Sequence, residues 1–227
     1  MRKYRLLLAD ADDTLFDFTA AERAALRQAL SAAGLPGDEA VYARYHHINR
    51  SLWALLERGE IRQNALRARR FELLLAELGL EGDVPAIAAA FTDALGQQAV
   101  PLPGAEQAVA RWAARVPVII LTNGIAAVQR ARLSRSLIGA LVTGVVISDE
   151  VGAAKPDARM VQAALALAPH VPKAEVLLLG DSLSADMAAA RNAGVDGCWL
   201  NPGGAPPAGL SPAYTIQSLD EVDALLV

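Results

Sequence analysis

The amino-acid sequence predicts an α/β protein that has a mostly parallel sheet with helices on both faces and an additional unit built only of helices. After residue 101, short runs rich in branched apolar residues alternate with alanine-rich helical stretches, which is typical of right-handed βαβ units. Between residues 18 and 100, apolar residues recur at helical spacing instead. The helical stretch is therefore predicted to be an insertion into the α/β fold.

The first expected strand covers residues 6–9, where the sequence LLLA is followed by Asp10, Asp12 and Asp13. A continuous apolar run is typical of a parallel strand that is covered on both faces. Carboxylates crowded at its end repel one another, and a bound cation would relieve this repulsion. Because ligands of open α/β sheets bind beyond the carboxyl ends of the strands, we expect the functional site here.

Helices are expected throughout the inserted unit. The first is predicted to begin with a capping box formed by Thr19 and Glu22, and to end at Gly34. Apolar residues at helical spacing predict further helices over residues 41–56, 61–78 and 85–97.

The sequence PLPG at residues 101–104 ends the inserted unit, because proline does not continue a helix smoothly. Beyond it, β-rich runs predict strands at residues 116–121, 144–147, 176–179 and 198–200. Together with the first strand, they predict a Rossmann-like core formed by residues 1–17 and 101–227, with the helical unit over residues 18–100.

Chemically distinctive residues follow these expected strands. The sequence TNG at residues 122–124 follows the second strand, and Lys155 lies shortly after the third. Asp181 comes just after the fourth strand, with Asp186 a few positions further on. Parallel strands end at the same edge of a sheet, so we expect these residues to converge with Asp10.

The residue types at this edge suit a metal ion and a phosphate. Mg²⁺ prefers oxygen ligands, so Asp10 and Asp181 with a backbone carbonyl would supply part of its shell. Lys155 and the hydroxyl of Thr122 would hold other oxygens of a phosphate group. The turn through Asn123 opens a helix, whose free backbone amides add affinity for the same anion.

These motifs, in this order, resemble those of the haloacid dehalogenase (HAD) superfamily of aspartate-nucleophile phosphohydrolases along nearly the whole chain. The matching segments are DADDTL from Asp10, LTNG ending at Gly124, KPD from Lys155 and GDSLSAD ending at Asp186. Within the superfamily, the segments ADADDTLFDF, LWALLERGEIRQNALRARRF and ISDEVGAAKPD are similar to those of the bacterial pyrimidine 5′-nucleotidases.

The resemblance implies a Mg²⁺-dependent phosphatase and a role for each motif residue. Asp10 would be the nucleophile, and Asp12 the general acid and base. Thr122 and Lys155 would bind the transferring phosphoryl group. The metal would be held by Asp10, Asp181 and the main-chain carbonyl of Asp12.

The resemblance also covers the surroundings of these residues. Asp186 would support the site from behind the metal ligands, and the helical unit would be the family's cap, inserted after the first strand. Asp13 stands where most members of the superfamily have glycine, and we assign it no catalytic role.

Substrate contacts are also considered within the cap, although aromatic residues at helical spacing more often belong to a core. A base could stack on an aromatic side chain and a phosphate could bind an arginine. The residues considered are Trp53, Arg62, Arg69, Arg70 and Phe71. Of these, we take Trp53 and Arg62 as the candidates.

Composition excludes several other classes of protein. The chain has 227 residues and a net charge of −4, with its arginines scattered among acids, so no basic stripe points to nucleic acid. No apolar stretch approaches the roughly 20 residues of a membrane span. Cys198 is the single cysteine, which excludes an intramolecular disulfide and agrees with a cytoplasmic location.

The expected substrate is a small phosphorylated metabolite, namely a nucleoside 5′-monophosphate, and two alternatives remain open. A 2-haloacid dehalogenase of the same fold uses an aspartate nucleophile without a metal; the acids Asp12, Asp181 and Asp186 argue against it. A phosphoacceptor module also combines acids, threonine and lysine, but it has its acidic pair on the first strand and its acceptor on the third. The sequence makes no prediction of the oligomeric state.

Overall fold

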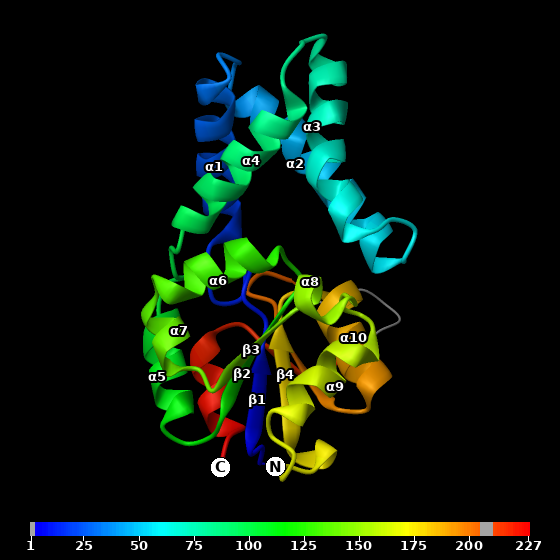
Figure 1. Ribbon diagram of the computed structural model, residues 1–227. Helices are drawn as coiled ribbons and strands as arrows, with labels where there is room; N and C mark the ends of the chain where they lie inside the picture. Colours follow the sequence, from blue (N-terminus) through cyan, green and yellow to red (C-terminus); the bar gives the residue numbers. More distant parts are fainter. Residues whose placement is uncertain (1–2, 205–210) are drawn as a thin grey trace.

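The core is a parallel sheet with helices on both faces. The computed structural model describes residues 3–204 and 211–227, and these residues form six strands in the order β3-β2-β1-β4-β5-β6 (Figure 1). The strands are β1 (Leu6–Ala9), β2 (Val118–Thr122), β3 (Gly144–Ile147), β4 (Val176–Gly180), β5 (Asp196–Leu200) and β6 (Tyr214–Ile216). The predicted α/β class and Rossmann-like parallel sheet are therefore confirmed.

The strands lie close to their predicted positions. β2 starts at Val118 and not at residue 116, because Pro117 lacks the N–H that a strand residue donates. β6 is an addition to the prediction: it pairs with β5 at the edge of the sheet and is three residues long, too short to show a periodic pattern.

Alternation along the strands divides the apolar side chains between the two faces of the sheet. The core helices are α5 (Ala105–Ala113), α6 (Ala126–Ser134), α7 (Leu137–Leu141), α8 (Ser148–Val151), α9 (Ala158–Ala166) and α10 (Ala188–Ala193), with the short turns η1 (Lys173–Glu175), η2 (Leu183–Met187) and η3 (Leu219–Ala224). On one face, Leu6 and Leu8 pack with Met160 of α9. On the other face, Leu7 packs with Trp112 of α5. The central strand β1 is therefore buried on both sides, as its continuous apolar sequence predicts.

A second group of helices lies at the end of the sheet where the strands finish (Figure 1). They are α1 (Phe18–Ala32), α2 (Glu39–Glu57), α3 (Gln63–Leu78) and α4 (Val84–Gln97), and they are called the cap below. The cap has its own core, in which the ring centroids of Tyr45, Phe71 and Phe91 lie 5.5 to 5.6 Å apart. Ile125 and Val128, at the start of α6, join this cluster, so the cap rests on the core through α6.

None of the helices formed by the described residues is long and apolar enough to cross a membrane.

The chain passes between core and cap through two segments that are hydrogen-bonded to each other. The N–H of Asp17 donates to the carbonyl of Val100 at 3.0 Å, and that of Leu102 donates to the carbonyl of Leu15 at 2.9 Å. The cap helices therefore start and finish at one place on the core.

Helix α1 begins differently from the predicted capping box. Asp17 is the N-cap residue, and its Oδ1 accepts the N–H of Ala20 at 2.8 Å. Asp13, whose φ of 57° is in the left-handed region, accepts the N–H groups of Phe18 and Thr19 at 3.1 and 3.3 Å. Because these two carboxylates satisfy the first donors of the helix, α1 starts ahead of Thr19, and the predicted capping box is wrong.

We expect Asp17→Ala to lower the free energy of unfolding by about 1 kcal/mol, because the N–H of Ala20 loses its cap. Thr19→Ala is the matched control: Thr19 is exposed and lies inside the helix, so a change below about 0.5 kcal/mol is expected. Urea unfolding followed by circular dichroism measures both variants. A larger loss for Thr19→Ala than for Asp17→Ala would contradict this assignment of the cap residue.

Candidate active site

The central strands bring several of the expected site residues to one edge of the sheet. β1 lies between β2 and β4, and the three strands run in the same direction. Asp10 follows β1, Thr122 is the last residue of β2, and Asp181 follows β4. Residues from distant parts of the sequence therefore meet at the edge that faces the cap (Figure 1).

Lys155 connects the carboxylates at this edge. Its Nζ donates to Asp10 Oδ1 at 2.5 Å, to Asp186 Oδ1 at 2.6 Å and to the carbonyl of Leu121 at 2.8 Å. Lys155 is 2% exposed, and burial by itself lowers the pKa of an ammonium group. Here the charges of Asp10 and Asp186 outweigh burial and raise the pKa of Lys155. The lysine is therefore a buried cation with all three donors used.

Asp10 is buried in the middle of this acidic group. Burial raises the pKa of Asp10 well above its usual value; Lys155 opposes this rise, and the neighbouring carboxylates add to it. The ionised form of Asp10 therefore depends on positive charge close by. Lys155 supplies part of that charge, and a bound cation would supply more.

Asp186 is fixed in the turn that follows β4. It lies in η2, which is π-helical, and its Oδ2 accepts the N–H of Ser182 at 3.0 Å. Gly180 is needed for this packing, because a Cβ at that position would come within 2.3 Å of the Asp186 carboxyl group. Both oxygens of Asp186 thus have protein donors, the second being Lys155.

The acids at this edge form a group that could hold a metal ion. Carboxylate oxygens of Asp10, Asp181 and Asp186 lie within 4.8 Å of one another. The hydroxyl of Thr14 lies 3.4 Å from Asp10 Oδ2 and 3.3 Å from Asp181 Oδ1. Burial and the charge of Asp186 raise the pKa of Asp181 to about 7. A set of hard oxygen donors with excess negative charge fits Mg²⁺.

Asp12 is held by two residues of α6. Gln129 Nε2 donates to Asp12 Oδ2 at 2.7 Å and to Thr122 Oγ1 at 3.1 Å. Arg132, which is fully buried, forms an ion pair with Asp12 Oδ1 through Nη1, and its Nε donates to the carbonyl of Gln98 at 2.9 Å. The carboxylate of Asp12 is therefore fixed at both oxygens. Because charge-assisted hydrogen bonds are strong and directional, it points in a defined direction.

The sequence interpretation missed Gln129 and Arg132. They lie three positions apart on a helix that opens at the TNG turn, so they share one face of that helix. That face also carries the buried Val128 and Leu133. A polar pair on the apolar face of a helix that starts at the active edge of the sheet is the signal that identifies them.

The side chain of Asn123 bonds to the main chain of Lys155. Its Oδ1 accepts the N–H of Lys155 at 2.7 Å, and its Nδ2 donates to the carbonyl of Lys155 at 2.9 Å. The side chain therefore fixes the main chain of Lys155. Thr122 is also buried, and its hydroxyl accepts from Gln129 behind the surface of the pocket.

A pocket lies between this edge and the cap. Its polar walls are formed by core residues, among them Asp10, Asp12, Asn123, Lys155, Asp181 and Asp186. The cap contributes Trp53, Glu57 and Arg70, and apolar side chains from α1, α4 and α6 complete the lining. Trp53 is thus one of the residues that line the pocket.

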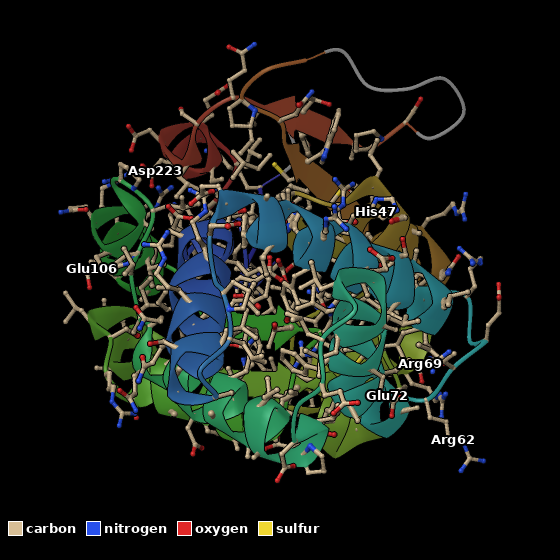
Figure 2. All side chains as sticks on the ribbon, turned by 90° about the horizontal axis from the view of Figure 1, so that it is seen from above. His47, Arg62, Arg69, Glu72, Glu106 and Asp223 are labelled. Carbon is tan, nitrogen blue, oxygen red and sulfur yellow. The ribbon has the colours of Figure 1, made fainter. Side chains whose placement is uncertain are left out.

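Arg62 is not brought to this pocket. It is exposed and lines a separate cavity next to Gly152 and Arg159. Figure 2 shows Arg62 at the outer rim of the cap, on the same side as Arg69 and Glu72. Helical spacing could not distinguish Arg62 from Arg70, because residues eight positions apart lie on nearly the same face of a helix. In the structure, Arg62 is the N-cap residue just before α3, whereas Arg70 lies inside the helix and is buried.

Comparison with known proteins agrees with this geometry. The family model of haloacid dehalogenase-like hydrolases matches residues 4–194. The HAD-hydrolase YfnB of Bacillus subtilis is 31% identical over 227 residues, covering 100% of this chain and 97% of YfnB. A crystal structure of YfnB bound to magnesium, which reveals interdomain movement in that protein, has a TM-score of 0.92 and covers 99% of both chains.

Two pyrimidine 5′-nucleotidases are also similar. YjjG of Escherichia coli is 32% identical over 228 residues, covering 99% of this chain and 98% of YjjG. PynA of Streptococcus pneumoniae is 36% identical over 200 residues, covering 88% of this chain and 84% of PynA. The family resemblance carried by the motifs is confirmed: this chain belongs to the haloacid dehalogenase-like hydrolases.

Proposed function

We propose that this hydrolase is a Mg²⁺-dependent phosphatase that acts on nucleoside 5′-monophosphates through an aspartyl phosphate on Asp10. The observation that carries the proposal is the position of Asp10, which lies between Lys155 and Asp181 at the end of the central strand. The names of YjjG and PynA support nucleoside monophosphates as the substrate class.

Magnesium would bind at Asp10, Asp181 and the main-chain carbonyl of Asp12. The donors are all oxygen, and both oxygens of Asp186 already accept protein N–H groups, which leaves Asp186 as a support for the other acids. When bound, the ion neutralises the acidic edge so that a phosphate dianion can approach it. The magnesium bound to YfnB supports magnesium as the ion.

The residues of the chain then divide the reaction between them. A carboxylate oxygen of Asp10 attacks phosphorus, and the bond from phosphorus to the ester oxygen breaks. The carboxyl group of Asp12 gives its proton to that leaving oxygen. In the second half, the Asp12 carboxylate takes a proton from a water molecule that attacks phosphorus, so phosphate leaves and Asp10 is regenerated. Lys155 and Thr122 would stabilise the charge on the phosphoryl oxygens.

We further propose that residues 18–100 act as a cap that closes over a core formed by residues 1–17 and 101–227. Two side-chain contacts join the cap and the core. Arg67 Nη2 donates to Asp149 Oδ2 at 2.7 Å, and Ser184 Oγ donates to Glu57 Oε2 at 3.0 Å. Closure would exclude water while the aspartyl phosphate forms. The interdomain movement in YfnB supports such a motion.

A metal-free 2-haloacid dehalogenase is the rival enzyme. Its ester intermediate is hydrolysed at the aspartyl carbon, whereas an aspartyl phosphate is hydrolysed at phosphorus. The anchored acid Asp12 favours the phosphatase, because expulsion of a halide needs no proton donor. A phosphoacceptor module would instead hold its phosphate without turnover.

We expect Asp10→Asn to lower Mg²⁺-dependent phosphate release from nucleoside monophosphates at least about a thousandfold, because the amide cannot attack phosphorus. In isotopically labelled water, the wild-type protein should place the label in the released phosphate and none in Asp10, as read by mass spectrometry. Label in Asp10, with halide released from a haloacid in EDTA, would identify the dehalogenase instead. A stable phosphorylated protein without turnover would identify the phosphoacceptor module.

Falling pH should weaken activation by magnesium. In the metal-free protein, burial and Asp186 raise the pKa of Asp181 to about 7, so this ligand is mostly protonated below that pH and mostly ionised above it. The Mg²⁺ concentration for half-maximal phosphate release should be about tenfold higher at about pH 6 than at about pH 8. Asp181→Asn should need far more Mg²⁺ at both values and lose this pH dependence. An unchanged requirement across the range for the wild-type protein would count against Asp181 as a ligand.

Arg132→Met should impair proton transfer by releasing one oxygen of Asp12. We expect kcat/KM for a nucleoside monophosphate to fall about 10- to 100-fold, and that for p-nitrophenyl phosphate by less than about threefold, because nitrophenolate leaves without a proton. Arg135→Met, which changes an exposed arginine of the next turn, is the control. Equal losses on both substrates would show that Arg132 acts on folding and not on Asp12.

A further inference from the structure

Glu57 is an acidic residue of the cap that lines the same pocket as Asp10. It is the last residue of α2, and it is half-buried. Its side chain also lines the neighbouring cavity, the one that Arg62 borders. The proposed mechanism uses Glu57 only for its contact with Ser184, which joins the cap and the core.

The contacts of Glu57 use only one of its carboxylate oxygens. Oε2 accepts the hydroxyl of Ser184 at 3.0 Å. Among the residues that the structure describes, none donates to Oε1, and this oxygen is not enclosed by protein atoms. The neighbouring Arg58 pairs with Glu60, and Lys155 already uses its three donors. Oε1 is therefore an acceptor that is open to the pocket.

A carboxylate at this position is costly. Burial and the charge of Asp186 raise the pKa of Glu57, and the hydroxyl of Ser184 and the charge of Lys155 oppose this rise only in part. The contact with Ser184 does not need a carboxylate, because the amide oxygen of glutamine also accepts a hydroxyl. A half-buried carboxylate without a counter-ion in a pocket therefore points to a hydrogen-bond donor on the ligand.

The position of Glu57 indicates which part of a substrate it meets. Trp53 lies four residues earlier on α2 and lines the same pocket, so the two side chains are neighbours on one face of the helix. Ser184 lies between Asp181 and Asp186 in the sequence, in the turn that follows β4. Glu57 is therefore next to the end of the pocket where the phosphoryl group is proposed to bind.

Sugar hydroxyls fit this position better than a second anionic group does. In a nucleoside 5′-monophosphate the ribose lies between the phosphoryl group and the base, and carboxylates of dinucleotide-binding folds accept ribose hydroxyls. A second anion would meet Glu57 and Asp13 instead. Among the described residues that line the pocket, Arg70 is the only cation besides Lys155. Its Nε and Nη2 are closed to solvent, and Nη1 donates to Asn49.

We propose that Glu57 is a specificity-determining residue of this pocket: it accepts hydrogen bonds from sugar hydroxyls of the leaving group and disfavours phosphate monoesters that carry a second anion. The inference rests on the proposed phosphatase function. It adds the part of the substrate that the end of α2 recognises.

Two sets of esters, compared by kcat/KM with Mg²⁺ present, separate sugar recognition from phosphoryl transfer. UMP, 2′-deoxyUMP and 2′,3′-dideoxyUMP share the base and the phosphoryl group and differ only in the sugar hydroxyls. Phenyl phosphate has no sugar, so it reports phosphoryl transfer alone. Glycerol 3-phosphate and 3-phosphoglycerate differ in that a hydroxymethyl group of the first is a carboxylate in the second.

The variants are Glu57→Ala and Glu57→Gln, with two controls. Ser184→Ala removes the contact between cap and core and keeps the carboxylate of Glu57. Glu60→Gln changes an exposed acid three positions further on that lines neither cavity.

We expect wild-type kcat/KM to be about 10- to 100-fold higher for UMP than for dideoxyUMP, because a hydrogen bond to a charged acceptor is strong. The value for 2′-deoxyUMP identifies which hydroxyl is bound. Glu57→Ala should lower UMP to the level of dideoxyUMP, mainly through KM, and should lower phenyl phosphate no more than Ser184→Ala does. Ser184→Ala and Glu60→Gln should keep the wild-type ratio of UMP to dideoxyUMP.

Glu57→Gln should reduce this ratio in part, because a neutral acceptor binds a hydroxyl less strongly than a carboxylate does. It should also narrow the wild-type preference for glycerol 3-phosphate over 3-phosphoglycerate, since it removes a negative charge from the pocket. If Glu57→Ala does not fold, Glu57→Gln still decides the question, because it keeps the size of the side chain.

A ratio of UMP to dideoxyUMP that is the same in both Glu57 variants as in the wild-type protein would overturn the proposal, as would a wild-type preference for 3-phosphoglycerate. Wild-type protein that hydrolyses phenyl phosphate and does not distinguish UMP from dideoxyUMP would refute the role of Glu57 alone. Wild-type protein that hydrolyses none of the esters would refute the proposed phosphatase itself.

Discussion

The ammonium group of Lys155, buried between Asp10 and Asp186, is the interaction on which the rest of the site depends. Two buried carboxylates repel each other and resist ionisation, and a buried cation with a donor for each is what allows them to stay together. The third N–H of the ammonium group donates to the carbonyl of Leu121, and the Asn123 side chain bonds to both the N–H and the carbonyl of Lys155. Lys155 therefore joins the ends of β1 and β2 and the turn after β4 at a single point.

Much of this arrangement could be predicted because strands of a parallel sheet share one active edge. The position of a residue directly after an apolar run was sufficient to bring Asp10, Thr122 and Asp181 to the same edge. Periodicity also located the cap helices, since their apolar residues recur every three to four positions over long segments. Both patterns are local in the sequence, and each determines the position of a strand end or a helix without any knowledge of distant contacts.

The rest depends on contacts that no local pattern contains. Asp17 caps α1 because Asp13 turns the chain through the left-handed region, and the sequence motif of a capping box could not reveal that turn. Gln129 and Arg132 reach Asp12 across more than a hundred residues of sequence. Arg70 and Arg62 lie on one short segment, and the packing of the cap decides which of them lines the pocket.

Arg132 connects Asp12 of the core with the segment of the chain that leaves the cap. Arg132, the partner of Asp12, also donates to the carbonyl of Gln98, the residue that follows α4 as the chain starts back toward the sheet. Any rotation of that returning segment displaces the Gln98 carbonyl. Because the Arg132 guanidinium is fully buried, it can move with this carbonyl only if the Asp12 carboxylate, its other partner, moves as well. The orientation of the Asp12 carboxylate and the position of the end of α4 are thus coupled through Arg132.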